Sequence, residues 1–318
     1  MMTPKCIRLK ANDYGAGKPE NLIMTNNIRF AFFGTPHLAT VFLDELESAG
    51  LVPSLVVTTP DKPHGRGLEV VAPPVKGWAA ARNIPVLQPE EFNTQVLKDM
   101  SIEIWDVFVV IYYGKVLPKP MLDIPKRGVL NVHFSLLPRW RGQSPVRSAI
   151  WNDDKEAGTS IILLDEKIDH GPVIAQKKIP LPEWPPKASA LEELSTRESA
   201  KLLVEILPSW LRGEIATHEQ NHDIATWCPA YTKEDGLLDL NDDAYKNLLK
   251  IRAFDTTVGT HAFFERSGKR LRVQILEAHI ESTRLIIDKV KPEGKKEMGY
   301  EEFLRSGATP SKVLRKDH

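Results

Sequence analysis

The sequence predicts an α/β protein in which a doubly wound, Rossmann-like domain precedes a smaller β-barrel-like domain. Short apolar runs alternate with helical patterns through the first two thirds of the chain. One of these runs, DVFVVIYY at 106–113, is continuously apolar, which is typical of a parallel strand buried on both faces. Beyond residue 236 the pattern changes to one helix followed by three candidate strands.

The first strand is expected at 28–33, before the turn Gly34-Thr35-Pro36 and a helix from His37 to Gly50. Pro36 suits a first helical turn, and Gly50 suits a C-terminal cap. The same periodicities predict the remaining elements of this domain. The strands are expected at 55–59, 84–88, 106–113, 128–132, 159–164 and 172–179, and the helices at 75–83, 91–100 and 144–151.

A long helical pattern follows at 188–213, and we expect Pro208 to kink or end it. After it we expect a helix at 242–254, strands at 260–266, 269–279 and 283–290, and a short helix at 300–305. The domain organisation is then an N-terminal extension, a main domain, a linker, a C-terminal domain and a tail. Their ranges are 1–26, 27–224, 225–236, 237–310 and 311–318.

Composition narrows the functional classes. The 318 residues contain 42 Lys and Arg against 42 Asp and Glu, so any binding of nucleic acid must come from a local patch. No apolar run approaches the ~20 residues of a membrane span. Cys6 and Cys228 have no metal-ligand spacing, which favours a reducing compartment without structural zinc. We expect a cytoplasmic monomer that binds neither a membrane nor a metal.

The turn Gly34-Thr35-Pro36 lies where a phosphate-binding loop would lie, after a strand and at a helix N-terminus. It matches neither the GxGxxG nor the Walker A pattern. A tight turn without a ligand is therefore an equal alternative to a phosphate loop.

The candidate catalytic side chains lie at the end of the strand expected at 128–132. Asn131 and His133 would point to the same face of the sheet, because side chains alternate along a strand. An amide can bind an oxyanion, and an imidazole can move a proton near neutral pH. Asp169, in a polar turn between two strands, is the candidate partner of the imidazole. A histidine that is merely structural is the alternative, and no nucleophile elbow is present.

Several motifs together resemble the folate-dependent formyltransferases, and among them the branch that acts on methionyl-tRNA. They occur in order over about residues 28–305 and keep the family's spacing. They are GTP at 34–36, TTPDKPHGRG at 58–67, APPVK at 72–76, NVHFSLLPRWRGQSP at 131–145 and DEKIDHGPV at 165–173.

The resemblance implies transfer of a formyl group from 10-formyltetrahydrofolate to an amine, without a metal. Asn131 and protonated His133 would stabilise the oxyanion, and His133 would also move the proton. Asp169 would orient the imidazole or hold a relay water. The folate would be held by backbone groups of one turn and by a facing wall, although plain core packing of these residues is the alternative. The turn is Ser135, Leu136, Leu137 and Pro138, and the wall is Tyr112, Tyr113, Gly114 and Asp165.

The resemblance also implies initiator methionyl-tRNA as the acceptor. The loop at 59–74 would reach the tRNA, but it carries Leu68-Glu69 where the family usually has lysines. Losing positive charge there is expected to weaken a salt-dependent attraction to phosphate. The expected tRNA contacts are Lys62, Arg66, Arg139, Arg141, Lys295 and Lys296, with a solvated, ion-paired surface as the alternative for the two middle arginines.

The C-terminal domain departs from the family's complete barrel, because only Glu281-Ser282-Thr283 separate two of its strands. We therefore expect an incomplete barrel. Residues 266–296 still carry nine Lys and Arg against four Asp and Glu, a local basic patch that fits RNA backbone binding. Two alternatives follow from these departures: a sugar-nucleotide N-formyltransferase, and an RNA-binding member that has lost turnover.

Overall fold

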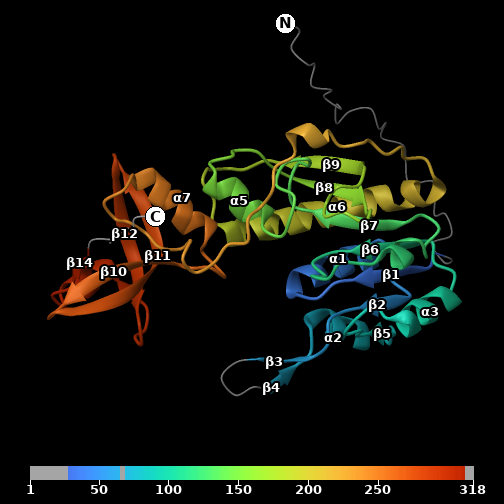
Figure 1. The fold of residues 1–318 in the computed structure, drawn as a ribbon, viewed down its shortest axis with the longest axis horizontal. Helices are drawn as coiled ribbons and strands as arrows, with labels where there is room; N and C mark the ends of the chain where they lie inside the picture. Colours follow the sequence, from blue (N-terminus) through green and yellow to red (C-terminus); the bar gives the residue numbers. More distant parts are fainter. Residues whose placement is uncertain (1–27, 65–68, 312–318) are drawn as a thin grey trace, which may run out of the picture.

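The fold consists of a seven-stranded sheet with helices on both faces and a second, five-stranded sheet at one end (Figure 1). It is taken from a computed structural model that describes residues 28–64 and 69–311. The expected extension at 1–26 and nearly all of the tail at 311–318 lie outside these residues.

The larger sheet has the strand order β5-β2-β1-β6-β7-β8-β9. Its first five strands are parallel, whereas β8 and β9 are antiparallel to their neighbours. The two antiparallel strands are joined by a short loop without a helix, which is the connection that antiparallel neighbours permit. The bounds are β1 Phe30–Phe33, β2 Leu55–Val57, β5 Val86–Leu87, β6 Val107–Val110, β7 Val129–His133, β8 Ala157–Leu163 and β9 Val173–Ile179.

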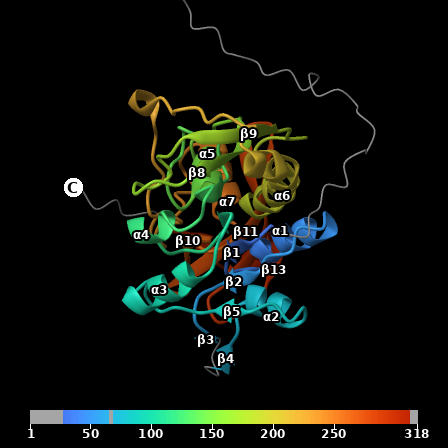
Figure 2. The same cartoon turned by 90° about the vertical axis from the view of Figure 1, so that its right-hand side faces the viewer.

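Helices cover both faces of this sheet, as the doubly wound prediction required. Figure 2 shows α1, α2 and α6 on one side of the strands and α3 and α4 on the other. Two separate apolar clusters fill these two interfaces. The bounds are α1 His37–Ser48, α2 Pro74–Ala80, α3 Thr94–Ile102, α4 Lys119–Leu122, α5 Pro145–Trp151 and α6 Ala188–Arg212.

Pro208 does not end α6, which continues to Arg212 before Gly213 adopts a left-handed conformation. Leu207 and Trp210, on either side of the proline, are both buried against the sheet. Tertiary packing therefore maintains the last turn despite the hydrogen bond that proline cannot donate.

The segment expected as a loop at 59–74 contains an antiparallel hairpin. It consists of β3, Lys62–His64, and β4, Glu69–Val71, and projects from the body of the protein (Figure 1). Pro63 and the charged neighbours hid these strands from a pattern based on alternating apolar residues. Arg66 lies between the described parts of this hairpin, outside the described residues.

The smaller sheet is antiparallel with the order β13-β12-β11-β10-β14. No pairing joins β13 to β14 among the described residues, so the sheet stays open, as the short connection at Glu281-Ser282-Thr283 predicted. Two helices pack beside it. The bounds are α7 Ala244–Ala253, β10 Thr260–Arg266, β11 Lys269–Glu281, β12 Arg284–Pro292, β13 Met298–Gly299, α8 Tyr300–Leu304 and β14 Thr309–Pro310.

An apolar cluster joins the two parts of the chain where α5 lies beside α7. Phe254, which follows α7 and is 1% exposed, packs there with Val146 and Ile150 of α5. The Asp255 carboxylate next to it accepts hydrogen bonds from the backbone N–H and the hydroxyl of Ser189, at the start of α6. These contacts fix the smaller sheet against the larger one.

Replacing Phe254 with alanine should therefore destabilise the whole chain. We expect Phe254→Ala to lower the free energy of unfolding by about 3–5 kcal/mol in a urea titration. The lost ring leaves a cavity in the buried apolar cluster between α5 and α7. Phe263→Ala is the matched control, since that ring is only half-buried on the smaller sheet, and should cost about 1 kcal/mol. Equal losses in the two variants would contradict this role of Phe254.

Candidate active site

Three polar side chains meet at the carboxyl end of β7. Asn131 and His133 share one face of this strand, and Asp169 reaches them from the loop between β8 and β9. The Asp169 carboxylate lies with Oδ1 3.5 Å from Asn131 Nδ2 and with Oδ2 3.4 Å from His133 Nδ1. His133 is 5% exposed and Asp169 is 9% exposed, so their interaction is poorly screened by water.

A backbone carbonyl determines how the imidazole is protonated. His133 Nε2 lies 2.8 Å from the carbonyl oxygen of Trp140, which can only accept a hydrogen bond. Nε2 therefore carries a hydrogen, and Nδ1 is the nitrogen that can exchange a proton with a substrate. Trp140 itself adopts a left-handed backbone conformation, with φ at 58°, and its N–H donates to the Thr226 hydroxyl.

The carboxylate is also fixed by the backbone. The N–H of Gly142 donates to Asp169 Oδ2 over 2.8 Å, while Asp169 adopts φ at 47°. Aspartate tolerates this left-handed conformation better than most residues. The loop folds so closely onto β8 that a Cβ on Gly171 would lie 1.8 Å from the Leu163 carbonyl oxygen. Only glycine fits there.

Arg141 is placed differently from the tRNA contact that the sequence predicted. It is 3% exposed, and its guanidinium contacts the Gln220 side-chain oxygen and His222 Nδ1. Burial lowers the pKa of Arg141, and the nearby carboxylates of Asp169 and Asp165 oppose this effect. Its Nε and Nη2 donors are used inside the protein, so a phosphate contact of Arg141 stays a prediction that this conformation does not favour.

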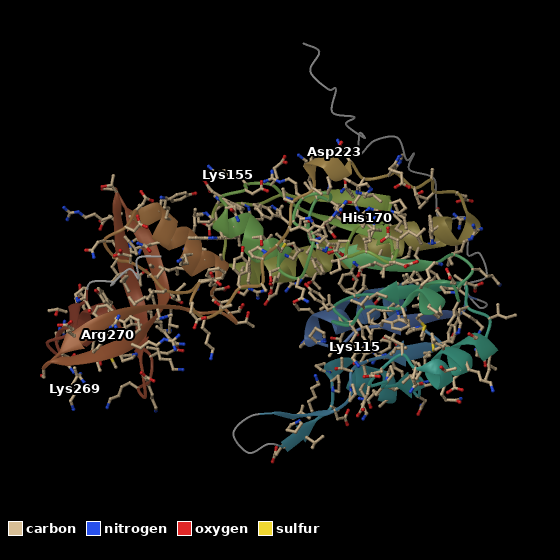
Figure 3. All side chains as sticks on the ribbon, in the orientation of Figure 1. Lys115, Lys155, His170, Asp223, Lys269 and Arg270 are labelled. Carbon is tan, nitrogen blue, oxygen red and sulfur yellow. The ribbon has the colours of Figure 1, made fainter. Side chains whose placement is uncertain are left out.

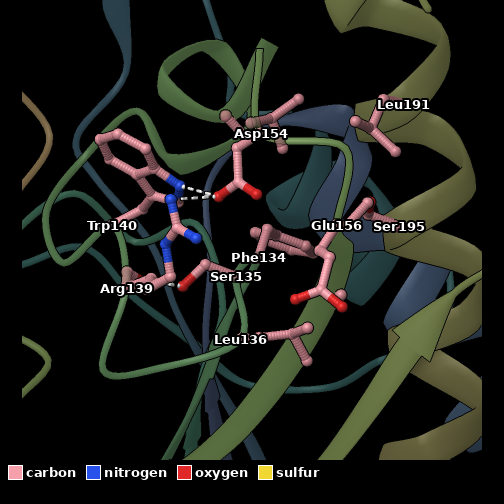
Figure 4. A pocket seen from close by; sticks show the side chains of 13 residues that line it. Phe134, Ser135, Leu136, Arg139, Trp140, Asp154, Glu156, Leu191 and Ser195 are labelled. Carbon is pink, nitrogen blue, oxygen red and sulfur yellow. Dashed lines mark hydrogen bonds and ion pairs between the residues drawn. The ribbon is translucent and has the colours of Figure 1, made fainter. Parts of the chain in front are cut away.

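Arg139 is partly accessible. It forms an ion pair with Asp154 over 2.8 Å, and Figure 4 shows its guanidinium and the Trp140 indole directed at this carboxylate. This matches the ion-paired alternative, although half of the side chain remains exposed. Among the other expected tRNA contacts, Lys62, Lys295 and Lys296 are exposed.

Several backbone groups of the turn Ser135–Pro138, which we predicted to hold the folate, are bonded within the protein. The Leu137 N–H donates to Ser160 Oγ, and the Leu137 carbonyl accepts from Gln176. The Ser135 and Pro138 carbonyls are also occupied by protein donors. Beside the turn, Ser135 and Leu136 line a cavity of about 20 Å³ (Figure 4), which is room for water but not for a folate.

The side chains of the predicted facing wall are also used inside the protein. The Tyr112 ring stacks on Phe134, and its hydroxyl lies 3.2 Å from Thr196 Oγ1. Tyr113 packs in the opposite core, where burial raises its pKa to about 12. Only Gly114, with φ at 79° and open space around its Cα, stays available for a close backbone approach.

A larger open pocket of about 700 Å³ lies between α4 and the loop that carries Asp169. It ends at His170, the neighbour of Asp169, which Figure 3 labels. Its size suits a drug-sized ligand. Asp165 is the single predicted folate contact that lines it; the other lining residues include Lys119, Leu122, Asp123, Leu164, Glu166 and Lys167.

The turn Gly34-Thr35-Pro36 is a tight turn. The Gly34 N–H donates to the Val57 carbonyl, and the Thr35 hydroxyl donates to the Tyr113 carbonyl. A Cβ on Gly34 would lie 3.0 Å from the Ile111 carbonyl oxygen, so the glycine permits the close approach of β1 and β6. The Gly34 N–H and the Thr35 hydroxyl are thus used within the protein, which matches the tight-turn alternative, and the phosphate loop stays a prediction.

Three groups that no sequence pattern predicted hold the three polar side chains. They are the Trp140 carbonyl, the Gly142 N–H and the Gln220 amide. The first two are backbone groups, which no residue pattern marks. Within the ranges 28–64 and 69–311, no group of three or more His, Cys, Asp or Glu residues is arranged to hold a metal ion, and no helix is long and apolar enough to cross a membrane.

A family model described as "Formyl transferase" matches residues 27–207. Three curated relatives bear the name methionyl-tRNA formyltransferase. The protein of Dictyoglomus thermophilum is 33% identical, and the match covers 87% of this chain and 96% of that relative. The protein of Myxococcus xanthus is 36% identical, with 87% and 94% of the two chains covered. The protein of Chloroflexus aurantiacus is 40% identical, with 77% and 79% covered.

Solved structures share the fold at lower identity. An N-formyltransferase from Helicobacter canadensis, in complex with folinic acid and dTDP-3-aminofucose, matches with a TM-score of 0.61 and 16% identity, over 80% of this chain and 88% of that one. A methionyl-tRNA formyltransferase from Clostridium thermocellum matches with a TM-score of 0.57 and 15% identity, over 84% and 99% of the two chains.

The hydrogen bond from His133 to the Trp140 carbonyl makes a spectroscopic prediction. In ¹⁵N-histidine-labelled protein, the neutral imidazole of His133 should carry its hydrogen on Nε2 and none on Nδ1. The Asp169→Asn variant is the control and should keep the Nε2 proton, because the carbonyl is independent of the carboxylate. A neutral His133 with its proton on Nδ1 would contradict the geometry.

Proposed function

The chain belongs to the formyl transferase family, and we propose that it transfers a formyl group from 10-formyltetrahydrofolate to the free amino group of initiator methionyl-tRNA. The observation that carries this proposal is the meeting of Asn131, His133 and Asp169 at one strand end, in a chain 33–40% identical to methionyl-tRNA formyltransferases. Such a transfer needs an oxyanion donor, a proton carrier and a group that holds the carrier.

The amine nitrogen bonds to the formyl carbon, and the bond from that carbon to folate N10 breaks. Negative charge develops on the formyl oxygen, where the Asn131 NH₂ and the protonated His133 Nδ1 donate hydrogen bonds. The amine loses a proton and N10 gains one, so no net proton is released. His133 Nδ1 gives its proton to N10 as that bond breaks and then takes the proton that the amine loses, because Nε2 is bound to the Trp140 carbonyl.

Asp169 stabilises the charged imidazole, since its Oδ2 lies 3.4 Å from His133 Nδ1. The formyl donor occupies the pocket of about 700 Å³ that ends at His170, one residue from Asp169. This pocket replaces the turn at Ser135–Pro138 as the principal folate contact and, among the predicted contacts, includes Asp165. The residues fit a co-substrate of this size without a metal ion.

The acceptor tRNA approaches the same edge of the sheet. The hairpin of β3 and β4 follows β2, so it projects from the edge where the parallel strands end and where Asn131 and His133 lie. Lys62 belongs to this hairpin, and Arg66, an expected tRNA contact, lies outside the described residues. The smaller sheet contributes Lys295 and Lys296, and Figure 3 shows Lys269 and Arg270 at its far end. Together with Arg139 these groups supply the positive charge that tRNA phosphates require.

The open C-terminal sheet favours one second candidate, a sugar-nucleotide N-formyltransferase, because a small acceptor needs no extended RNA surface. The names and identities of the curated relatives favour the tRNA instead. Both candidates use the same three side chains, so the acceptor alone distinguishes them.

Formyl transfer should be measured with 10-formyltetrahydrofolate while methionyl-tRNA and amino-sugar nucleotides are offered in parallel. We expect transfer to methionyl-tRNA, and a loss of about 10²–10³ in kcat for Asn131→Ala, because one oxyanion donor is removed. Transfer to the sugar alone would contradict the acceptor assignment. Near-normal transfer by folded Asn131→Ala would contradict the mechanism.

A second prediction concerns the exposed Glu69 at the start of β4. Restoring positive charge with Glu69→Lys should lower the KM for methionyl-tRNA and make the salt dependence of log KM steeper by about one unit. The KM for the formyl donor should not change. Glu205→Lys, an equal charge reversal at an exposed position of α6, is the control and should leave both constants unchanged. A KM for tRNA that does not fall in Glu69→Lys would contradict contact between this hairpin and the tRNA.

A further inference from the structure

The side chain of Gln220 lies beneath the loop that carries Asp169, in the irregular segment after α6. It is 6% exposed, and all four hydrogen-bonding capacities of its amide are used. Nε2 donates to the Asp169 carbonyl over 2.9 Å and to the Gly171 carbonyl over 2.7 Å. Oε1 accepts from Arg141 Nε over 3.2 Å and from Arg141 Nη2 over 2.7 Å.

These partners determine the orientation of the amide. Two carbonyls can only accept and a guanidinium can only donate, so a reversed amide would place like groups against each other on both sides. Each of these bonds is buried, and losing a partner would leave a desolvated polar group. The loop and the arginine are thus held in one arrangement by a single side chain.

The backbone at Arg141 is also connected to the Asp169 carboxylate, through the next residue, Gly142. The Arg141 N–H donates to the Thr226 carbonyl, and its own carbonyl accepts from Cys228, so the backbone here is fixed on both sides. The next N–H, that of Gly142, donates to Asp169 Oδ2. Asp169 is therefore held at its backbone by Gln220 and at its carboxylate by Gly142.

This support matters because Asp169 occupies a sparsely populated backbone conformation and reaches its partners at 3.4 and 3.5 Å. A displacement of 1 Å at such a site can cost on the order of 10²-fold in rate. We propose that Gln220, held by Arg141, is a positioning residue that keeps the Asp169 carboxylate beside His133 during formyl transfer. This inference rests on the proposed function for its kinetic readout.

The proposal extends the active site beyond the region that matches the family model, which ends at residue 207. Gln220 and Thr226 both lie between that region and the smaller sheet, and both bind the groups that hold the reacting side chains. The connecting segment is accordingly part of the catalytic structure.

The test compares Gln220→Met, which removes all four hydrogen bonds at similar volume, with Gln220→Glu, which keeps an acceptor for Arg141 but loses both donors. We expect kcat to fall on the order of 10²-fold in both, with the KM values for folate and tRNA within about threefold of wild type. The matched control is Asn247→Leu, because Asn247 is also buried and donates to a backbone carbonyl, that of Asp239, in the smaller domain. It should lose stability but keep kcat.

A double-mutant cycle separates positioning from general destabilisation. If Gln220 acts through Asp169, Gln220→Met should cost less than about threefold in the Asp169→Ala background. The same large loss in that background, or kcat within about threefold of wild type in both folded single variants, would overturn the proposal.

A crystal structure of Gln220→Met provides a readout that does not depend on the reaction. We expect Asp169 Oδ2 to move away from His133 Nδ1, and an unchanged loop would overturn the positioning role. If the wild-type chain itself formylated no methionyl-tRNA, the proposed function would fail, and this structure would still decide the role of Gln220.

Discussion

The active site depends on two backbone groups of the bend that follows β7. The Trp140 carbonyl fixes His133 Nε2, and the Gly142 N–H fixes Asp169 Oδ2. Because these groups are only two residues apart, the bend sets the imidazole and the carboxylate relative to each other. The buried pair of Arg141 and Gln220 then connects the bend to the backbone of the Asp169 loop. Residues from three separate segments of the chain thus act as one unit.

Elements that bury a continuous run or a regular stripe of apolar residues were predictable from the sequence. Elements whose form depends on pairing with another strand were not. The strand at β6 and the long α6 follow from apolar runs and helical spacing, which report burial directly. The hairpin of β3 and β4 carries charges, one proline and two exposed valines, so no such pattern marks it. The direction of β8 depends on pairing with β7, and pairing partners lie outside any local window.

The site was predictable to the extent that side-chain chemistry identifies it. Asn131 and His133 stand out by strand alternation, and Asp169 stands out by its place in a polar turn between two strands. The burial of Arg141 was not predictable, because an arginine in a polar motif gives no sign of whether its donors face water or a buried glutamine. Tyr112 and Tyr113 were likewise assigned to the ligand, while their rings fill two opposite cores. The contribution of Trp140 is made by its carbonyl, which every residue possesses.

The central claim is that a formyl group is activated between Asn131 and His133 and that the folate fills the pocket ending at His170. A crystal structure with a stable 10-formyl-folate analogue tests this most directly. The account predicts a formyl oxygen within about 2.6–3.2 Å of Asn131 Nδ2 and within similar reach of His133 Nδ1. A folate bound elsewhere, or a formyl group directed away from both atoms, would contradict it.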